Sequence, residues 1–109
     1  MVRPGDIVTV EFPGATGTKR RPTVVVSTDL YHKTRPDVIL GVLTTQVASA
    51  TMPSDYLLRD WTTAGLRQPS AFRAFLATMP VSSITVVGHL SARDWDAVQN
   101  CLKSALSTS

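Results

Sequence analysis

The alternation of apolar and polar residues near the start of the chain predicts a half-buried β-strand. Over residues 6–12, Val8 and Val10 face one side, while Thr9 and Glu11 face the other. A strand with this pattern places one face in a core and leaves the other in solvent. Further strands are therefore needed to cover the apolar face.

Runs of β-branched and aliphatic residues supply these strands. Residues 23–27 form such a run, which we expect to be buried on both faces. Pro22 should stand at its start, because proline has no N–H to donate to a sheet. Other strands are predicted at residues 38–44, 56–58, 70–78 and 84–90. Loops are predicted at residues 13–18 and 27–37 and over most of 45–69, with a single turn at 81–83.

The last part of the chain has the periodicity of an α-helix. Ser91 is the predicted N-cap, and Asp94, three residues later, gives a short-armed version of a capping box. We expect Cys101 to lie in the core together with Trp95. The apolar stripe of this helix consists of Trp95, Val98, Leu102 and Ala105.

Five or six short strands followed by one helix indicate a mainly β fold. The expected architecture is a small, strongly curved antiparallel sheet or barrel that is closed by the helix. The chain has 109 residues, of which 43% are hydrophobic and 17% charged, so we expect one globular domain over residues 1–109 rather than a disordered chain.

Composition excludes several classes of function. The apolar runs are far shorter than a membrane span, and no signal-peptide pattern precedes the first strand, so we expect a cytoplasmic protein without membrane contact. The single cysteine, Cys101, and the two histidines, His32 and His89, fit no metal-ligand spacing, so we expect neither a metal nor a cofactor. A net charge of +3 permits a polyanionic partner without requiring one.

Two segments carry the candidate chemistry. In residues 14–22, a glycine-bearing stretch ends in three cations, Lys19, Arg20 and Arg21, and Pro22 restricts the backbone of Arg21. Guanidinium groups bind phosphate in bidentate fashion, although the same segment could be an ordinary solvated basic loop. In residues 43–46, Thr44, Thr45 and Gln46 end an apolar strand. Their polar groups could donate to phosphate oxygens or base edges, or could merely cap the strand.

Other polar residues are weaker candidates. We expect His89 to be buried with its ring hydrogen-bonded rather than to be catalytic. The segments Asp60–Trp61 and Arg67–Ser70 belong to a loop that either touches a ligand or closes one end of the barrel.

Taken in order, these segments resemble the MazF/PemK family of toxin–antitoxin ribonucleases. Each motif is weak alone, whereas their order and spacing together are quite specific. The matching segments are Arg3–Val8, Gly14–Pro22, Thr23–Ser27, Leu43–Gln46, Asp60–Ser70, Ala77–Met79 and Gly88–Ser91. The resemblance implies an SH3-like, CcdB/PemK-type barrel with a C-terminal helix, usually a homodimer.

The resemblance also implies an activity, namely metal-independent, sequence-selective cleavage of single-stranded RNA such as mRNA. The substrate's 2′-OH attacks the adjacent phosphate and leaves 2′,3′-cyclic phosphate and 5′-OH ends. The residues at the family's catalytic positions are Arg21 and Thr44. We expect RNA contacts from Thr16, Gly17, Thr18, Lys19, Arg20, Thr45, Gln46 and Ser70.

The chain departs from some relatives on a later strand. These relatives carry an Arg-x-Asp set there, whereas this chain has Arg73 with no aspartate two residues later, and Ala77 where the family has an arginine. The chain therefore fits the Arg/Thr form of the site.

The resemblance implies a partner as well. This would be a MazE-like antitoxin whose acidic tail occupies the RNA groove, and DNA would be contacted only through that antitoxin. Two alternatives stay open: a CcdB-like topoisomerase inhibitor, and a nucleic-acid-binding barrel without activity. The first depends on C-terminal side chains, and residues 103–109 do not resemble such a tail.

Overall fold

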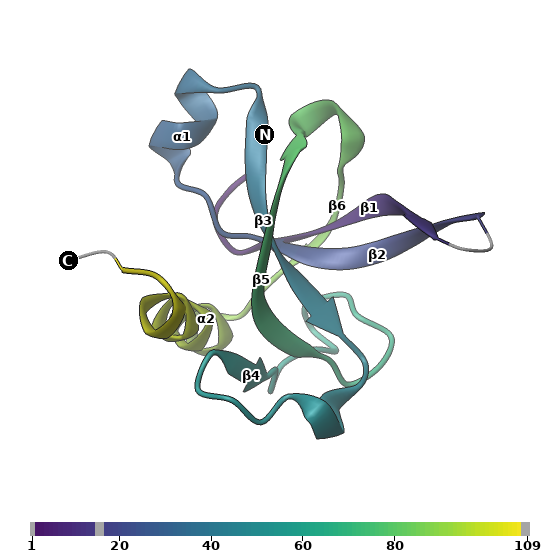
Figure 1. Ribbon diagram of the computed structural model, residues 1–109, viewed down its shortest axis with the longest axis vertical. Helices are drawn as coiled ribbons and strands as arrows, with labels where there is room; N and C mark the ends of the chain where they lie inside the picture. Colours follow the sequence, from purple (N-terminus) through teal and green to yellow (C-terminus); the bar gives the residue numbers. More distant parts are fainter. Residues whose placement is uncertain (1, 15–16, 108–109) are drawn as a thin grey trace.

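The computed structural model describes residues 2–14 and 17–107. They form one antiparallel sheet, two α-helices and two 3-10 turns (Figure 1). The sheet has the strand order β4-β5-β3-β2-β1-β6. Its strands are β1 (Asp6–Gly14), β2 (Gly17–Val25), β3 (Asp37–Thr44), β4 (Asp55–Leu57), β5 (Ala71–Pro80) and β6 (Thr85–His89). The helices are α1 (Asp29–Thr34) and α2 (Ala92–Ala105), with 3-10 turns η1 (Val47–Ser49) and η2 (Val81–Ser83).

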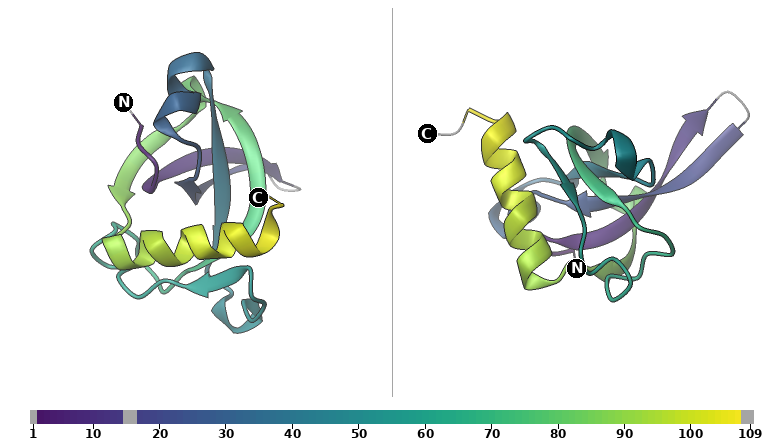
Figure 2. Two further views of the ribbon diagram at one scale, coloured as in Figure 1. Left: turned by 90° about the vertical axis from the view of Figure 1, so that its left-hand side faces the viewer. Right: turned by 90° about the horizontal axis from the view of Figure 1, so that it is seen from below.

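The sheet is strongly curved, and α2 runs across one side of it (Figure 2). Within the described residues, β4 and β6 form the two outer edges and are not hydrogen-bonded to each other. The predicted mainly β fold with a C-terminal helix is confirmed, as an incompletely closed barrel. The strands predicted at 38–44, 56–58, 70–78 and 84–90 are present with boundaries moved by one or two residues, and η2 is the predicted turn.

Buried apolar side chains form two clusters, one on each face of the curved sheet. The cluster on the helix face contains Ile7, Val24, Leu43, Leu58, Ala64, Phe72, Leu90, Val98 and Cys101. The cluster on the opposite face contains Val2, Val8, Val10, Val25, Val38 and Leu40. Gly41 is needed between the strands, because a Cβ at this position would collide with the ring of Phe72. Since both faces are packed, residues 23–25 of β2 are buried on both sides, as the β-branched run predicts.

The β1–β2 hairpin is longer than the sequence pattern predicts. Its ladder continues to the pair Gly14–Gly17, so most of the predicted 13–18 loop is strand. The prediction for Pro22 is wrong, because Pro22 lies inside β2, opposite Thr9. Among the described strands, β3 begins to pair with β2 only at Thr23. Residues 17–22 therefore form an edge on that side, where a missing N–H costs little.

The helix α1 is a second correction, since residues 27–37 were predicted to be a loop. Thr28 caps this helix, with its hydroxyl oxygen accepting from the Tyr31 N–H at 3.2 Å. All six residues of α1 are at least partly exposed. The helix therefore lacks the apolar stripe by which the sequence pattern could have revealed it.

The helix α2 begins where predicted. The Ser91 hydroxyl oxygen accepts from the Asp94 N–H at 3.3 Å. The other half of the expected capping box is absent from the described structure, because the buried Asp94 carboxylate turns toward the segment after β4. Within the stripe, Val98 is buried and Trp95 and Leu102 pack against its cluster, which also contains the buried Cys101. Ala105, in the last turn, is exposed, contrary to prediction.

Candidate functional site

Side-chain alternation along β2 separates the three cations of the basic triplet. Arg20 lies in register with Glu11, on the face that carries Ile7 and Val24. Its guanidinium donates to the hydroxyls of Thr9 at 2.9 Å and Thr85 at 3.0 Å, and pairs with the Glu11 carboxylate at 3.3 Å. Arg20 therefore ties β2 to β1 and β6.

Lys19 and Arg21 alternate to the opposite face. Arg21 lies in register with the buried Val10 and is itself exposed. Neither Lys19 nor Arg21 forms an ion pair or side-chain hydrogen bond with another described residue. The Arg21 guanidinium is thus exposed and has no side-chain partner among the described residues.

Thr44 ends β3 on the same face as Arg21. The β2–β3 register runs from Val25–Leu40 to Thr23–Val42, and two further steps along both strands lead to Arg21 and Thr44. Beyond Thr23 the β1–β2 hairpin projects away from β3 (Figure 1). Arg21 and Thr44 therefore lie on the same face of neighbouring strands, just beyond the paired part of the β2–β3 ladder.

The Thr44 hydroxyl is partly committed to the backbone. Its oxygen accepts from the Gln46 N–H at 3.1 Å, which leaves its hydrogen free to donate elsewhere. Thr45 and Gln46 are exposed beside it. The predicted strand-end capping is therefore present, and it is compatible with a second contact from the same hydroxyl.

The remaining predicted RNA-contact residues are placed less uniformly. Gly17 starts β2 and is exposed, the backbone of Thr18 pairs with Pro13, and Thr16 lies outside the described residues. Ser70 is only 2% exposed, and its hydroxyl donates to the Gln68 carbonyl at 3.0 Å. The described structure thus does not present the Ser70 side chain to solvent.

Arg73 on β5 extends this face by one more strand. It lies in register with Val42 on one side and Asp55 of β4 on the other. The Arg73 Nε lies 3.7 Å from Asp55 Oδ1, and the Asp55 side chain is 4% exposed. The sequence has no aspartate two residues after Arg73, but the fold places Asp55 of β4 beside the Arg73 side chain. Asp55 directly precedes the predicted 56–58 strand, so pairing that strand with 70–78 could have revealed it.

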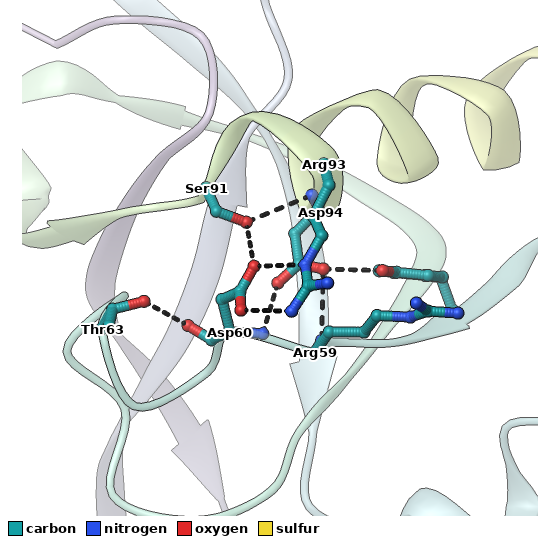
Figure 3. Close-up of polar contacts among 7 residues, drawn as sticks. Arg59, Asp60, Thr63, Ser91, Arg93 and Asp94 are labelled. Carbon is teal, nitrogen blue, oxygen red and sulfur yellow. Dashed lines mark hydrogen bonds and ion pairs between the residues drawn. The ribbon is translucent and has the colours of Figure 1, made fainter.

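The loop that contains Asp60 closes one end of the sheet onto α2 (Figure 3). Arg93 binds the Asp60 carboxylate in bidentate fashion, with both contacts at 2.7 Å. The Ser91 hydroxyl donates to the same carboxylate at 2.6 Å. The Arg93 hydrogen bonds, followed by the one from Ser91, lower the pKa of Asp60 to about 2. The sequence left two roles open for the loop of Asp60, contact with a ligand or closure of one end of the barrel. The structure shows Asp60 closing that end by binding Ser91 and Arg93.

Asp94 forms the buried part of this network. Its carboxylate accepts from the Tyr56 hydroxyl at 2.6 Å, the Arg59 N–H at 3.1 Å and the Asp60 N–H at 2.8 Å. Burial, and then the hydrogen bond to Asp94, raise the pKa of Tyr56 to about 12. Asp94 therefore joins α2 to the segment that follows β4.

His89 differs in part from expectation. Its ring is hydrogen-bonded, with Nδ1 2.7 Å from Asp6 Oδ1, as predicted, but its side chain is 40% exposed rather than buried. Across residues 2–14 and 17–107, no group of three or more His, Cys, Asp or Glu side chains is placed to hold a metal ion.

Comparison with known proteins identifies the family. The model of the PemK-like, MazF-like toxins of type II toxin–antitoxin systems matches residues 3–106. The chain belongs to this family. No protein with a curated description matches the sequence. None of the described helices is long and apolar enough to cross a membrane.

Solved structures of such toxins share the fold. A mycobacterial endoribonuclease in complex with its cognate antitoxin has 16% identity and a TM-score of 0.80, with all of both chains covered. A MazE–MazF structure from Deinococcus radiodurans has 18% identity and a TM-score of 0.78, covering 99% of this chain and 98% of that one. The Mycobacterium tuberculosis toxin MazF-mt6 has 20% identity and a TM-score of 0.72, covering 92% and 94%.

Proposed function

We propose that this chain is an endoribonuclease toxin that cleaves single-stranded RNA without a metal ion, with Arg21 and Thr44 as its catalytic residues. The observation that supports the proposal is that both side chains lie on the face of Val25 and Leu40, each two residues beyond the last β2–β3 pair, Thr23–Val42. Arg21 has no ion pair within the described chain, and Thr44 keeps a free hydroxyl hydrogen, so both are available to a phosphate.

The proposed chemistry needs little from the protein, because the RNA supplies its own nucleophile. The 2′-OH loses its proton to a base and attacks the adjacent phosphorus, the bond from phosphorus to the 5′-oxygen breaks, and that oxygen takes up a proton. The products therefore carry 2′,3′-cyclic phosphate and 5′-OH ends. Negative charge builds on the non-bridging oxygens as the pentacoordinate transition state forms. The Arg21 guanidinium neutralises this charge, and the Thr44 hydroxyl donates a hydrogen bond to it. Arginine stays protonated at any working pH, so its role is electrostatic.

The proposed RNA path follows the same face of the sheet. Lys19 and Arg73 supply further cations, and the exposed groups of Gly17, Thr45 and Gln46 border the path. We leave Arg20 out of this path because its guanidinium is bound to β1 and β6 on the other face. Ser70 is left out because it is buried.

We further propose that the toxin is a homodimer with an antitoxin partner. The solved relatives include an endoribonuclease with its cognate antitoxin and a MazE–MazF structure. An acidic antitoxin segment suits the same cations that would bind RNA phosphates. Copurification of this chain with the product of a neighbouring reading frame tests this part of the proposal, and absence of a complex would contradict it.

The catalytic proposal is tested by incubating the purified chain with single-stranded RNA in EDTA and mapping the product ends. We expect discrete cuts with 2′,3′-cyclic phosphate and 5′-OH ends. Intact RNA, or cleavage that needs added metal, would overturn the proposal. Growth arrest with intact RNA would instead favour an inhibitor of the CcdB type.

A further inference from the structure

Phe75 is an aromatic side chain that the proposed chemistry does not use. It is 74% exposed, although it lies inside β5. On β3, Gly41 pairs with Leu76, whereas the following residue, Val42, pairs with Arg73. Ala74 and Phe75 are therefore bulged out of the ladder between these pairs. Bulges redirect side chains and occur often beside active sites.

The bulge borders a small hollow between β4 and β5. The hollow has a volume of about 250 Å³ and is lined by Ser54, Asp55, Arg73, Ala74 and Phe75. Asp55 is held in turn, because its Oδ2 accepts from the Met52 N–H at 3.1 Å. The Arg73 guanidinium is thus tethered at one edge of the hollow while half of its side chain remains in solvent.

Arg73 and Phe75 lie on the same side of β5, since both line the hollow. Arg73 is in register with Val42, and Thr44 is the next residue of β3 on that face. Arg73, which lines the hollow, therefore lies on the same face of the sheet as Thr44 and Arg21. An exposed ring beside cations is the combination that binds single-stranded nucleic acid, with bases stacking on the ring and phosphates meeting the cations.

We propose that this hollow binds one nucleobase of single-stranded RNA, with the Phe75 ring as the stacking surface and Arg73, tethered by Asp55, along its edge. The inference rests on the proposed function, because it places the base next to the phosphate that Arg21 and Thr44 would hold. Lys19 and Arg21 on the same face have no carboxylate partner among the described residues, so RNA phosphates would match their charge, whereas an apolar segment of a protein partner would not.

The test compares binding of two strands of equal length and charge. One is a 12-nucleotide 2′-O-methyl RNA of mixed sequence, which cannot be cleaved by 2′-OH attack, and the other is its fully abasic counterpart. Phe75→Ala should weaken binding of the base-bearing strand by about 5- to 100-fold and leave the abasic strand unaffected. Phe75→Trp should retain wild-type affinity. Leu30→Ala removes a similarly exposed apolar side chain, 72% exposed on α1, and should change neither affinity.

Each other outcome contradicts the inference. Equal affinities of wild type and Phe75→Ala for the base-bearing strand would show that the ring does not stack on a base. An equal loss on both strands, accompanied by a changed oligomeric state in light scattering, would make Phe75 a protein contact. Because binding is measured without cleavage, RNA cleavage with no Phe75 effect would overturn this inference alone. A Phe75-dependent preference for bases without any cleavage of natural RNA would overturn the proposed function alone.

Discussion

Arg20 and Arg21 are neighbours in the chain, yet the structure gives them different surroundings. Arg20 is held by Thr9, Glu11 and Thr85. Arg21 lies on the other face, which is also the face of Thr44. A single step along a β-strand thus separates a cation that holds the sheet together from one that is available to a substrate.

Thr44 provides the first prediction. Thr44→Val keeps the shape of the side chain and removes the hydroxyl, so single-turnover RNA cleavage should slow by about 100- to 1,000-fold, the usual cost of losing one transition-state donor. Thr44→Ser keeps the donor and should retain most of the rate. A Thr44→Val protein that melts like wild type and cleaves at the wild-type rate would remove Thr44 from the mechanism.

Asp94 provides a prediction about stability. Asp94→Ala leaves the Tyr56 hydroxyl and the N–H groups of Arg59 and Asp60 without their acceptor. Losing a buried charged acceptor should lower the free energy of unfolding by about 3 kcal/mol, measured by urea denaturation. Asp96→Ala removes an exposed carboxylate of the same helix and serves as the control, with a change within about 0.5 kcal/mol. Equal effects of the two substitutions would show that helix charge, and not the Asp94 network, is responsible.

At the residue scale the sequence predicted Arg21 and Thr44 as a pair, but not which cations share their face. That distinction depends on the hairpin ladder continuing through residues 17–22, where the sequence shows glycine, cations and proline instead of a strand pattern. Asp55 was missed for a related reason. Its contact with Arg73 exists because β4 pairs with β5, and the short 56–58 strand had no predicted partner.

At the scale of elements, α2 is fixed by polar contacts of its first turn and by apolar contacts farther along the helix. Ser91 and Arg93 bind Asp60, Asp94 binds the segment after β4, and Val98 and Cys101 enter the core on the helix face. Burial also raises the pKa of the Cys101 thiol, so we expect it to stay protonated and slow to react in the folded protein.

The Asp60–Arg93 pair predicts how stability depends on pH. The folded pKa of Asp60, about 2, is below its ordinary value of 3.8, so the folded protein favours the ionised carboxylate. Its contribution is therefore complete above about pH 4 and is lost as the pH falls toward 2. Urea unfolding of Asp60→Asn should show a smaller loss of stability than wild type across this interval. Identical pH dependence of the two proteins would mean that the pair contributes nothing to folding.

The sequence predicted most of the elements, because strands and α2 have clear apolar patterns. It missed α1, which is capped by Thr28 but buries no apolar stripe in the described structure. The sequence pattern also placed Pro22 at a strand start. Pro22 is tolerated inside β2 because β3 pairs with β2 only from Thr23 onward, which leaves one side of Pro22 at an edge. Both errors concern features that tertiary context decides.

At the scale of the whole molecule, two apolar clusters pack against the curved sheet, and the β1–β2 hairpin projects from it (Figure 2). The proposed RNA path crosses three strands, with Arg21 on β2, Thr44 on β3 and Arg73 on β5. The order of weak motifs indicated the family correctly, whereas the face shared by these residues could be recognised only from the fold.

The most direct test of the central claim is single-turnover cleavage of single-stranded RNA in EDTA by wild type, Arg21→Ala and Arg20→Ala. The two variants lose the same charge from adjacent positions of one strand, and thermal melting of each confirms that it folds. We predict a loss of about 100-fold or more for Arg21→Ala and a rate close to wild type for Arg20→Ala. Equal losses, or full activity of Arg21→Ala, would contradict the assignment of the catalytic site to the face of Arg21 and Thr44.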